Sequence, residues 1–403
     1  MARASRSPFG SNEPARRPGY RRLRYWADEH DGRGYTRHSR TIRGTKRDGW
    51  DELARIRLAH GRDAPCPTVG QAWEMWVLPE LDRKLAAYLS DPVGTPPSDR
   101  VKPETHRGKL SVWRNHVAPR WDDVPLSDVR ALDVQEWVDG LSTGYKTVRN
   151  AFSMLRLILS RGVKYEAIER NVLADTDDWD LPSAASGPAD IWTLDELVYG
   201  LWPQLWGGPA EGAFILAAFG SCRPGESLGP KVDEVRLVER DGMSVALVPI
   251  VRQVGDDGVP TADGDLKNGW SPRTVAIPEP WSLRLDELCE DRSARPVWLT
   301  DRFGEPWPRP RLADALDAAA RAAGLPHKEP RALRRSWRSW MATETDIPGE
   351  VLEKMMGHVG RGVTGRHYLA MTDDALASIV SRAFSARPIL VDWDKLGHRL
   401  HKL

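Results

Sequence analysis

The chain has 403 residues, too many for one ordinary domain, and its 58 Lys and Arg nearly balance its 57 Asp and Glu. No apolar run approaches the ~18 residues of a membrane span, and the Arg-rich N-terminus lacks the apolar segment of a signal peptide, so we expect neither a membrane protein nor a secreted one. Cys66, Cys222 and Cys289 show no paired spacing, which argues against a zinc site or a disulfide framework and favours a reducing interior.

Positive charge is concentrated near the N-terminus. Residues 1–62 contain 16 Lys and Arg and 7 Asp and Glu, so their net charge is 16 − 7 = +9 and the remainder carries +1 − 9 = −8. A basic segment of this kind is typical of contact with a polyanion, although a solubilising tail is the alternative. Residues 1–17, rich in Ser, Pro, Gly and Arg, predict a disordered basic tail.

Residues 18–62 predict a small α+β domain. Basic and aromatic residues alternate around a Gly-rich turn at 32–34, which indicates strands, and the stretch 46–60 predicts a helix. A solvated face would give the same pattern of charge. The strand residues that are candidates for contact with a polyanion are Arg22, Arg24, Arg37 and Arg40.

Residues 68–173 predict four helices in a small bundle. Thr68 is expected to cap the first helix, a proline-rich loop follows at 90–104, and Pro119 is expected to end the second helix. Acidic and then Ser/Ala/Gly/Pro-rich residues at 174–190 indicate an interdomain linker. Several basic residues of the bundle are candidates for phosphate contact, although a solvated face explains each one alone: Lys109, Arg114, Lys146, Arg149 and Arg156.

Residues 191–386 predict a third, mainly helical domain. Thr193 and Glu196 form a capping-box pattern, and an apolar helix at 212–219 follows. Alternating apolar residues on both sides of the stretch 263–269 predict a β-hairpin with a long tip. Beyond it, helices are expected from residue 331 and from 349 to 356, with Gly357 as a left-handed cap and His358 on the turn.

Five short motifs in this domain occur in a defined order. They are Gly220-Ser-Cys-Arg223-Pro-Gly-Glu226, Lys267 at the hairpin tip, Arg331-Ala-Leu-Arg334, Met356-Gly357-His358, and Tyr368. Each residue alone would usually be structural. Their joint occurrence in this order resembles the tyrosine recombinases, the phage integrase family.

This resemblance implies a metal-free and cofactor-free chemistry. Arg223 and Arg334 would bind the oxygens of the scissile phosphodiester, because two planar guanidiniums stabilise its added charge in the transition state. His358 would donate to the phosphate or orient it. Lys267 would protonate the leaving 5′-oxygen, and Tyr368 would be the nucleophile that forms a covalent 3′-phosphotyrosine.

Two positions depart from the family pattern. Gly220-Ser221 replaces the usual Thr-Gly, and Arg331 replaces the usual His, so Arg331 is expected to bind phosphate. A guanidinium does not give up its proton in a protein, so Arg331 does not deprotonate Tyr368. His367, His358, water or a phosphate oxygen remain as candidates for that role.

The resemblance also implies a multidomain, mainly α architecture. Residues 18–62 would be an arm-type DNA-binding domain, 68–173 a four-helix SAM-like core-binding bundle, and 191–386 the catalytic domain with its small β-hairpin sheet. The tail at 387–403 carries a second apolar set and is expected to dock in its own domain or on a neighbouring protomer.

The expected partners are double-stranded DNA at core and arm sites, a homo-tetramer on DNA, an excisionase and a host DNA-bending protein. The expected location is the cytoplasm of a bacterial host, on the nucleoid when the protein is bound to DNA. The expected role is integration or excision of a phage or mobile element. A catalytically inactive DNA-binding relative, or a Xer-like resolvase of chromosome dimers, is the alternative.

Overall fold

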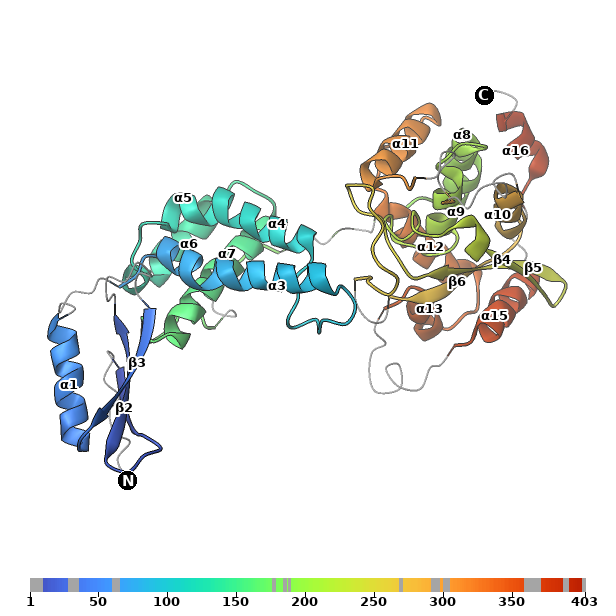
Figure 1. Ribbon diagram of the computed structural model, residues 1–403. Helices are drawn as coiled ribbons and strands as arrows, with labels where there is room; N and C mark the ends of the chain where they lie inside the picture. The colour runs from blue at the N-terminus through green and yellow to red at the C-terminus, as the bar shows by residue number, and fades with distance from the viewer. Residues whose placement is uncertain are drawn as a thin grey trace. The chain divides into compact units, whose positions relative to one another are not determined.

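The computed structural model divides into two compact units, residues 1–186 and 187–403 (Figure 1). It describes residues 10–27, 36–59, 66–175, 179–183, 187, 190–267, 271–290, 298–299, 305–358, 371–386 and 391–400. Among these residues, every helix is too short or too polar to cross a membrane. Two small sheets, one in each unit, accompany a larger number of helices, as the sequence predicts.

The first unit begins with an antiparallel sheet in the order β1-β2-β3. Its strands are β1 (Gly10–Pro14), β2 (Tyr20–Ala27) and β3 (Thr36–Arg43), and helix α1 (Lys46–Ala59) contacts β1 and β2. Leu23 and Tyr25 on β2 are buried with Leu53 and Ile56 of α1, so this helix covers one face of the sheet. The other face is open around Arg22 and Arg24, whereas Trp26 at its end is buried against Trp76 and Tyr165.

The expected disorder of residues 1–17 is wrong for Gly10–Pro14. All five residues of β1 pair with β2, from Gly10 opposite Tyr25 to Pro14 opposite Arg21. Asn12 fixes the strand further, because its side-chain amide donates to the carbonyl of Lys46 at 2.8 Å. The composition of residues 1–17 predicts disorder, but pairing with β2 and the contact of Asn12 hold Gly10–Pro14 as a strand.

The rest of the first unit is the predicted bundle of four helical segments. The first is α2 (Val69–Ala72), η1 (Trp73–Val77) and α3 (Leu78–Ser90); the second is α4 (Pro103–Val112), η2 (Trp113–Val117) and α5 (Ala118–Trp121); the third and fourth are α6 (Ala131–Gly140) and α7 (Tyr145–Lys164). The predicted cap is confirmed, since Thr68 and Gln71 form a reciprocal capping box. Trp121, Phe152 and Ile158 lie in a fully buried core.

The first two helical segments continue past a proline, and the turn before the proline is a wider π-helix. Pro119 was expected to end the second helix, but the chain stays helical to Trp121. Proline lacks an N–H and its ring crowds the carbonyl four residues earlier. The preceding turn therefore opens into a π-helix, in which the backbone N–H of Ala118 bonds to the carbonyl of Trp113. The same widening precedes Pro79 in the first segment.

Part of the predicted linker belongs to the bundle. Trp179 and Leu181 pack against the bundle core, and the Trp179 ring lies 5.1 Å from that of Phe152. The carbonyl of Asp180 accepts a hydrogen bond from Gln135 at 3.3 Å. The acidic composition of residues 174–190 indicated a linker, but two apolar residues within it are enough to hold this stretch on the helices.

The second unit surrounds a sheet in the order β4-β5-β6. The predicted hairpin is confirmed, with β5 (Met243–Ile250) antiparallel to β6 (Arg273–Ile277), and β4 (Arg236–Arg240) adds an edge strand. The predicted capping box at Thr193 and Glu196 is also present. The other elements are η4 (Glu196–Leu201), α8 (Trp202–Leu205), α9 (Glu211–Ala218), α10 (Trp281–Glu290), α11 (Arg309–Ala322), α12 (Arg331–Glu344), α13 (Gly349–Met355), α15 (Asp373–Ala386) and α16 (Trp393–Leu400).

Helix α9 is buried along its whole length at the centre of this unit. It contacts α12, α10 and α8, whereas α15 covers the sheet (Figure 1). The C-terminal helix α16 contacts α8 and η4 of the same chain, with Leu396 fully buried and the backbone N–H of Asp392 bonded to the Tyr199 hydroxyl at 2.8 Å. In this structure the tail therefore docks in its own domain, one of the two expected arrangements.

Candidate active site

A sharp turn after α9 positions Arg223. Ser221 has a φ of +61°, in the left-handed region that favours glycine. Its hydroxyl donates to the carbonyl of Met355 at 3.1 Å, which helps to hold this conformation. Ser221 stands where the recombinase motif has glycine, so the departure seen in the sequence keeps the backbone conformation that a glycine there would adopt without strain.

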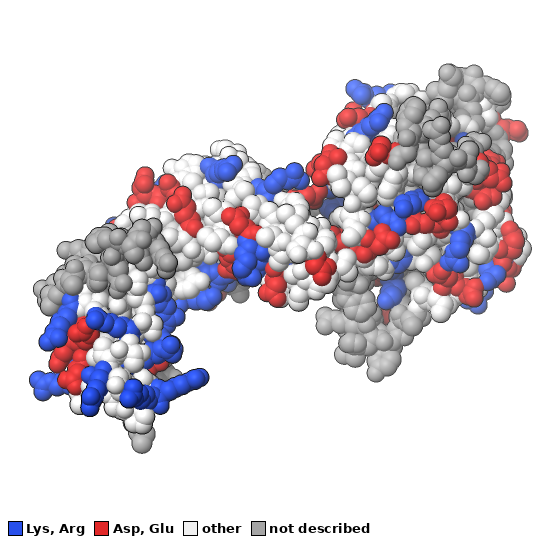
Figure 2. Space-filling view, viewed as in Figure 1, with Lys and Arg blue, Asp and Glu red and all other residues white. Residues whose placement is uncertain are grey.

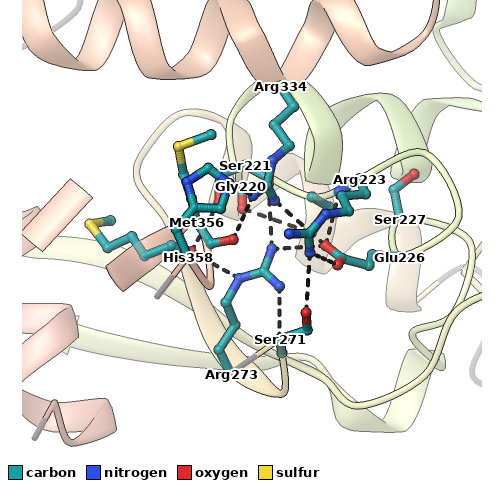
Figure 3. Close-up of polar contacts among 12 residues, drawn as sticks. Gly220, Ser221, Arg223, Glu226, Ser227, Ser271, Arg273, Arg334, Met356 and His358 are labelled. Atoms are coloured by element: carbon teal, nitrogen blue, oxygen red, sulfur yellow. Dashed lines mark hydrogen bonds and ion pairs between the residues drawn. The ribbon is translucent and has the colours of Figure 1, made fainter. Parts of the chain in front are cut away.

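The buried carboxylate of Glu226 lies among three arginines (Figure 3). Arg223 donates its backbone N–H to Glu226 Oε2 at 2.9 Å and pairs with Oε1 through its guanidinium. Arg273 donates to Oε2 at 2.9 Å, and Arg334 Nη1 lies 3.7 Å from the same oxygen. We call Arg223, Arg273 and Arg334, together with Glu226, the arginine cluster.

The arginine cluster retains positive charge. Burial alone would raise the pKa of Glu226, but Arg273 and Arg223 outweigh burial and hold that pKa below its ordinary value. Burial, and then the charges of Arg273 and Arg223, lower the pKa of Arg334 to about 9. Since one carboxylate does not neutralise three guanidiniums, the cluster favours an entering anion.

Arg334 is held rigidly from α12. Leu333 and Trp337 bury one side of this helix, as predicted, and Arg334 is also buried. Its Nη1 donates to the carbonyl of Ser221 at 2.5 Å, and its Nη2 donates to the carbonyl of Met356 at 2.6 Å. These two acceptors fix the plane of the guanidinium before any ligand arrives.

Part of the Arg223 guanidinium is not engaged in hydrogen bonds with the described residues. The side chain of Arg223 is 14% exposed, and its contacts with the described residues use only the backbone N–H and Nη1, which also lies 3.5 Å from the Ser271 hydroxyl. Within the described part of the chain, its Nε and Nη2 meet no acceptor. Arg223 can therefore donate to an entering oxyanion without breaking an existing bond.

Arg273 is the member of the cluster that the sequence interpretation missed. It opens β6, and its guanidinium also donates to the carbonyls of Met355 at 2.9 Å and Ser271 at 3.0 Å. Arg273 thereby ties the sheet to the end of α13 and to Glu226. The available signal was an arginine at the start of an alternating apolar strand, directly after the hairpin tip.

His358 is placed by the turn that ends α13. Gly357 has a φ of +67°, and the backbone N–H groups of Gly357 and His358 bond to the carbonyls of Lys354 and Glu353 at 2.8 and 3.0 Å, which is a Schellman motif. The predicted left-handed cap is confirmed. His358 Nε2 lies 3.0 Å from Arg334 Nη2, so the imidazole joins the arginine cluster (Figure 3).

Two other predicted site residues, Lys267 and Arg331, do not join the cluster. Lys267 is exposed on the loop between β5 and β6, and Arg331 is exposed at the first position of α12. Tyr368 lies outside the described residues, as does His367. The structure therefore brings together Arg223, Arg334 and His358 and leaves the remaining assignments as predictions.

In the N-terminal sheet, three of the four candidate arginines share the open face. Arg22 and Arg24 alternate with Leu23, which faces α1, and Arg37 pairs opposite Trp26 on the same side as Arg24. We call Arg22, Arg24 and Arg37 the open-face arginines. Figure 2 shows Lys and Arg gathered around this part of the unit.

Arg40 lies on the other face of that sheet. It pairs opposite Leu23 and forms an ion pair with Glu52 of α1 at 2.9 Å. Its side chain is 59% exposed, so the pair is solvated. Arg40 therefore occupies a different surface from the other three candidates.

The candidate residues of the bundle lie on two of its four segments, the second and the fourth. Arg114, Lys146 and Arg156 are exposed, and the exposed Arg149 donates to the carbonyl of Pro182 at 2.8 Å. Lys109 is half-buried; burial, and then the charge of the nearby Lys84, lower its pKa. Any contact of these residues with DNA remains a prediction.

No protein-family model matches the sequence, and no curated protein matches it. Several solved structures do match the chain. The integrase of transposon Tn1549 in complex with circular intermediate DNA is 18% identical, with a TM-score of 0.55, over 80% of this chain and 100% of that chain. A variant of that integrase in complex with transposon right end DNA is 19% identical, with a TM-score of 0.54 and the same coverage. A lambda integrase dimer bound to a COC′ core site is 18% identical, with a TM-score of 0.47, over 92% of this chain and 99% of that chain.

The chain has the tyrosine recombinase fold. At these identities the likeness establishes the fold alone. Within the recombinase fold, the arginine cluster and His358 lie together although the sequence from Arg223 to His358 is long, and the turn at Ser221, β6, α12 and α13 each contribute one part of the site.

Proposed function

We propose that this protein is a site-specific tyrosine recombinase, an integrase that cleaves and rejoins DNA through a 3′-phosphotyrosine. The observation that carries the proposal is the arginine cluster. Arg223 and Arg334, from separate segments, are fixed beside His358 and retain positive charge. A phosphodiester is an anion whose charge repels nucleophiles, and preorganised guanidiniums stabilise the extra charge of its transition state.

The remaining roles follow from the chemistry of the side chains. Tyr368 would attack the phosphorus and Lys267 would protonate the leaving 5′-oxygen. A phenol with a pKa of ~10 needs help to ionise at neutral pH, and a cationic site provides part of it. Arg331 would contact a phosphate oxygen.

The first unit would bind DNA in two ways. The open-face arginines would contact arm-type sites, and the helical bundle would contact the core site. The known structures that resemble this chain include integrases solved in complex with DNA, which supports double-stranded DNA as the partner. A tetramer on DNA, an excisionase and a host bending protein would complete the reaction, which would integrate or excise a phage or mobile element.

The decisive experiment is a covalent trap. The crossover site is first mapped from the borders of the genomic element, and a duplex nicked next to it is then incubated with the full chain. The short fragment beyond the nick diffuses away after cleavage, so the phosphotyrosine adduct accumulates and shifts on a denaturing gel.

Tyr368→Phe is the matched variant. It removes only the nucleophilic oxygen, so the adduct should vanish while DNA binding stays within about threefold. An adduct that persists in this variant would reject Tyr368 as the nucleophile. If the wild-type chain binds the site and forms no adduct, the alternative of a DNA-binding relative without catalysis is favoured.

A further inference from the structure

A carboxylate lies against the side of His358 that faces away from Arg334. His358 Nδ1 is 2.5 Å from Glu353 Oε2, and the backbone N–H of His358 bonds to the carbonyl of Glu353 at 3.0 Å. Glu353 has no role in the proposed chemistry so far. The Schellman turn at Gly357 explains the proximity, because it folds the third residue after the helix back onto the residue five positions earlier.

The hydrogen-bond partners of the two ring nitrogens determine which nitrogen of His358 carries the proton. A guanidinium only donates hydrogen bonds, so the contact of Arg334 Nη2 with His358 Nε2 at 3.0 Å requires Nε2 to be the acceptor. In the neutral ring the proton is then on Nδ1, which donates to Glu353. Both nitrogens thus have defined roles, and Nε2 carries the lone pair within the arginine cluster.

Glu353 is itself fixed by α12. Its second oxygen, Oε1, accepts a hydrogen bond from Arg338 Nε at 3.2 Å. Arg334 and Arg338 lie one turn apart on α12, so this helix holds the imidazole through Arg334 and the carboxylate through Arg338. A lone contact between a carboxylate and a histidine needs no such support, and here four side chains form one chain of hydrogen bonds.

We propose that Glu353 is a positioning residue that holds His358 as the base for Tyr368. The inference rests on the proposed function and deepens it. Arg331, at the position where the recombinase motif has histidine, does not release its proton, so the phenolic proton needs another acceptor. His358 Nε2 accepts from Arg334 and is therefore an unprotonated nitrogen already fixed in the cluster.

The step balances in protons and charge. When a phosphate enters, its oxygens compete for the N–H of Arg334, which frees the lone pair of His358 Nε2. The proton of Tyr368 Oη moves to Nε2, the phenolate attacks phosphorus, and the bond from phosphorus to the 5′-oxygen breaks. That oxygen takes a proton from Lys267. The carboxylate of Glu353 stabilises the imidazolium, which returns its proton to the tyrosine on rejoining.

Other charges also act on His358. Those on the surrounding elements are Arg334 and Arg338 from α12, Glu353 from α13, Arg273 from β6, and Arg223 and Glu226 from the loop after α9. Among these groups, Glu353 is the carboxylate in direct contact with the ring. Its loss should therefore affect proton transfer more than it affects the fold.

The first test separates the base from the acid. Cleavage is measured on the nicked crossover duplex and on the same duplex with sulfur in place of the bridging 5′-oxygen. A thiolate leaves without protonation, so this substrate should restore cleavage by Lys267→Ala. It should not restore cleavage by Glu353→Leu or by Glu353→Gln. We expect Glu353→Leu to slow cleavage about 10²-fold. Glu353→Gln keeps an acceptor oxygen and should slow cleavage about tenfold.

Glu350→Gln is the matched control, because it removes an exposed carboxylate from the same helix. It should cleave both substrates at the wild-type rate. Thermal melting and DNA binding are measured for every variant. Restoration of Glu353→Leu by the sulfur substrate, or wild-type cleavage by that variant, would overturn the proposal.

Two further readouts distinguish positioning from a general structural defect. The defect of Glu353→Leu should shrink as the pH rises toward ~10, where the phenol ionises without a base. In 15N spectra of the DNA-free chain, the His358 ring should show a protonated Nδ1 and an unprotonated Nε2, assigned by the signals lost in His358→Gln.

These outcomes are separable from those of the proposed function. A defect that is constant with pH, or an Nε2-protonated ring, would reject the role of Glu353 while leaving the adduct of the wild-type chain intact. Absence of the wild-type adduct on every substrate would reject the proposed function instead, and the ring tautomer would then remain the test of whether Glu353 orients His358.

Discussion

The two groups of arginines in this protein differ in how they are held. Each guanidinium of the arginine cluster is directed by buried acceptors, among them the Glu226 carboxylate and the carbonyls of Ser221 and Met355. The open-face arginines lie on a sheet surface. Among the described residues, Arg24 has only a 3.8 Å pair with Glu13, and Arg22 has a 3.3 Å contact with Ser39.

That difference determines what each group can do. Removing a charge from water costs free energy. Buried charges that are held in a fixed geometry then interact strongly with an anion placed among them. Exposed charges are screened by salt and contribute to binding mainly by releasing counterions from DNA. We therefore expect the cluster to govern rate and stability, and the open face to govern affinity and its salt dependence.

The largest expected effect comes from removing the counter-charge of the cluster. Glu226→Gln leaves three guanidiniums without their carboxylate, and breaking a buried ion pair in this way costs about 3–5 kcal/mol of unfolding free energy. Chemical denaturation of the full chain at pH 7 measures it, with the exposed Glu350→Gln as control.

The pH dependence of this effect has a defined sign. The pKa of Glu226 is lowered in the folded state, so its contribution to stability is present above the ordinary pKa of a glutamate, ~4.3, and is lost as the pH falls through the folded value. The difference between wild type and Glu226→Gln should therefore shrink below about pH 4. A difference that stays constant down to pH 3 would contradict the ionised pair.

Substitution of the guanidiniums that face the phosphate should act on rate. We expect Arg223→Ala or Arg334→Ala to reduce cleavage of the nicked duplex by roughly 10²-fold or more, the scale for losing a preorganised donor to a developing anion. DNA binding, measured by gel shift, should change by only a few fold, since the bundle and the sheet retain their contacts. Near-wild-type cleavage would remove that arginine from the chemistry.

Much of this site could be predicted because its residues occur in short, ordered motifs. The spacing of Arg223 to Glu226, and of Arg334 to His358, indicated the residues that the fold then brought together. Helix signals at Thr68, Thr193 and Gly357 were reliable, because capping is a local property of a few neighbouring residues.

The missed residues depend on contacts that the sequence does not show directly. Arg273 belongs to none of the sequence motifs, and only the pairing of β5 with β6 reveals that its side chain reaches Glu226. Glu353 was predictable in principle, because a left-handed glycine at 357 folds His358 back onto it. Pro119 was misread because a π-turn absorbs the missing hydrogen bond.

A smaller effect should distinguish Arg273 from other buried arginines. Arg273→Lys keeps the charge but loses the multiple bonds to Glu226 and the carbonyl of Met355, so we expect cleavage to fall about tenfold. Arg284→Lys is the matched control, because Arg284 makes two bonds to the buried Glu211 away from the cluster. Both should melt at lower temperature, and only the first should cleave more slowly after correction for folding.

The smallest effect at the core site, and the one most sensitive to salt, is expected from the open-face arginines. Replacing all three with alanine should weaken binding to a distal class of DNA site but leave cleavage at the crossover site unchanged. Each lost phosphate contact reduces the slope of log K against log salt by about 0.9, so the slope should become shallower by roughly 2 to 3. Deleting residues 1–62 should remove distal protection in a footprint altogether.

Arg40→Ala is the control that tests the geometry of the sheet rather than its charge. Like Arg37→Ala, it removes one positive charge from β3, but Arg40 lies on the α1 side and pairs with Glu52. If the open face contacts DNA, this variant should keep nearly the wild-type slope. An equal loss for Arg40→Ala and Arg37→Ala would mean that distal binding responds to net charge alone, and the distinction between the two faces of the sheet would be abandoned. A normal footprint after deletion of residues 1–62 would reject the arm-domain assignment itself.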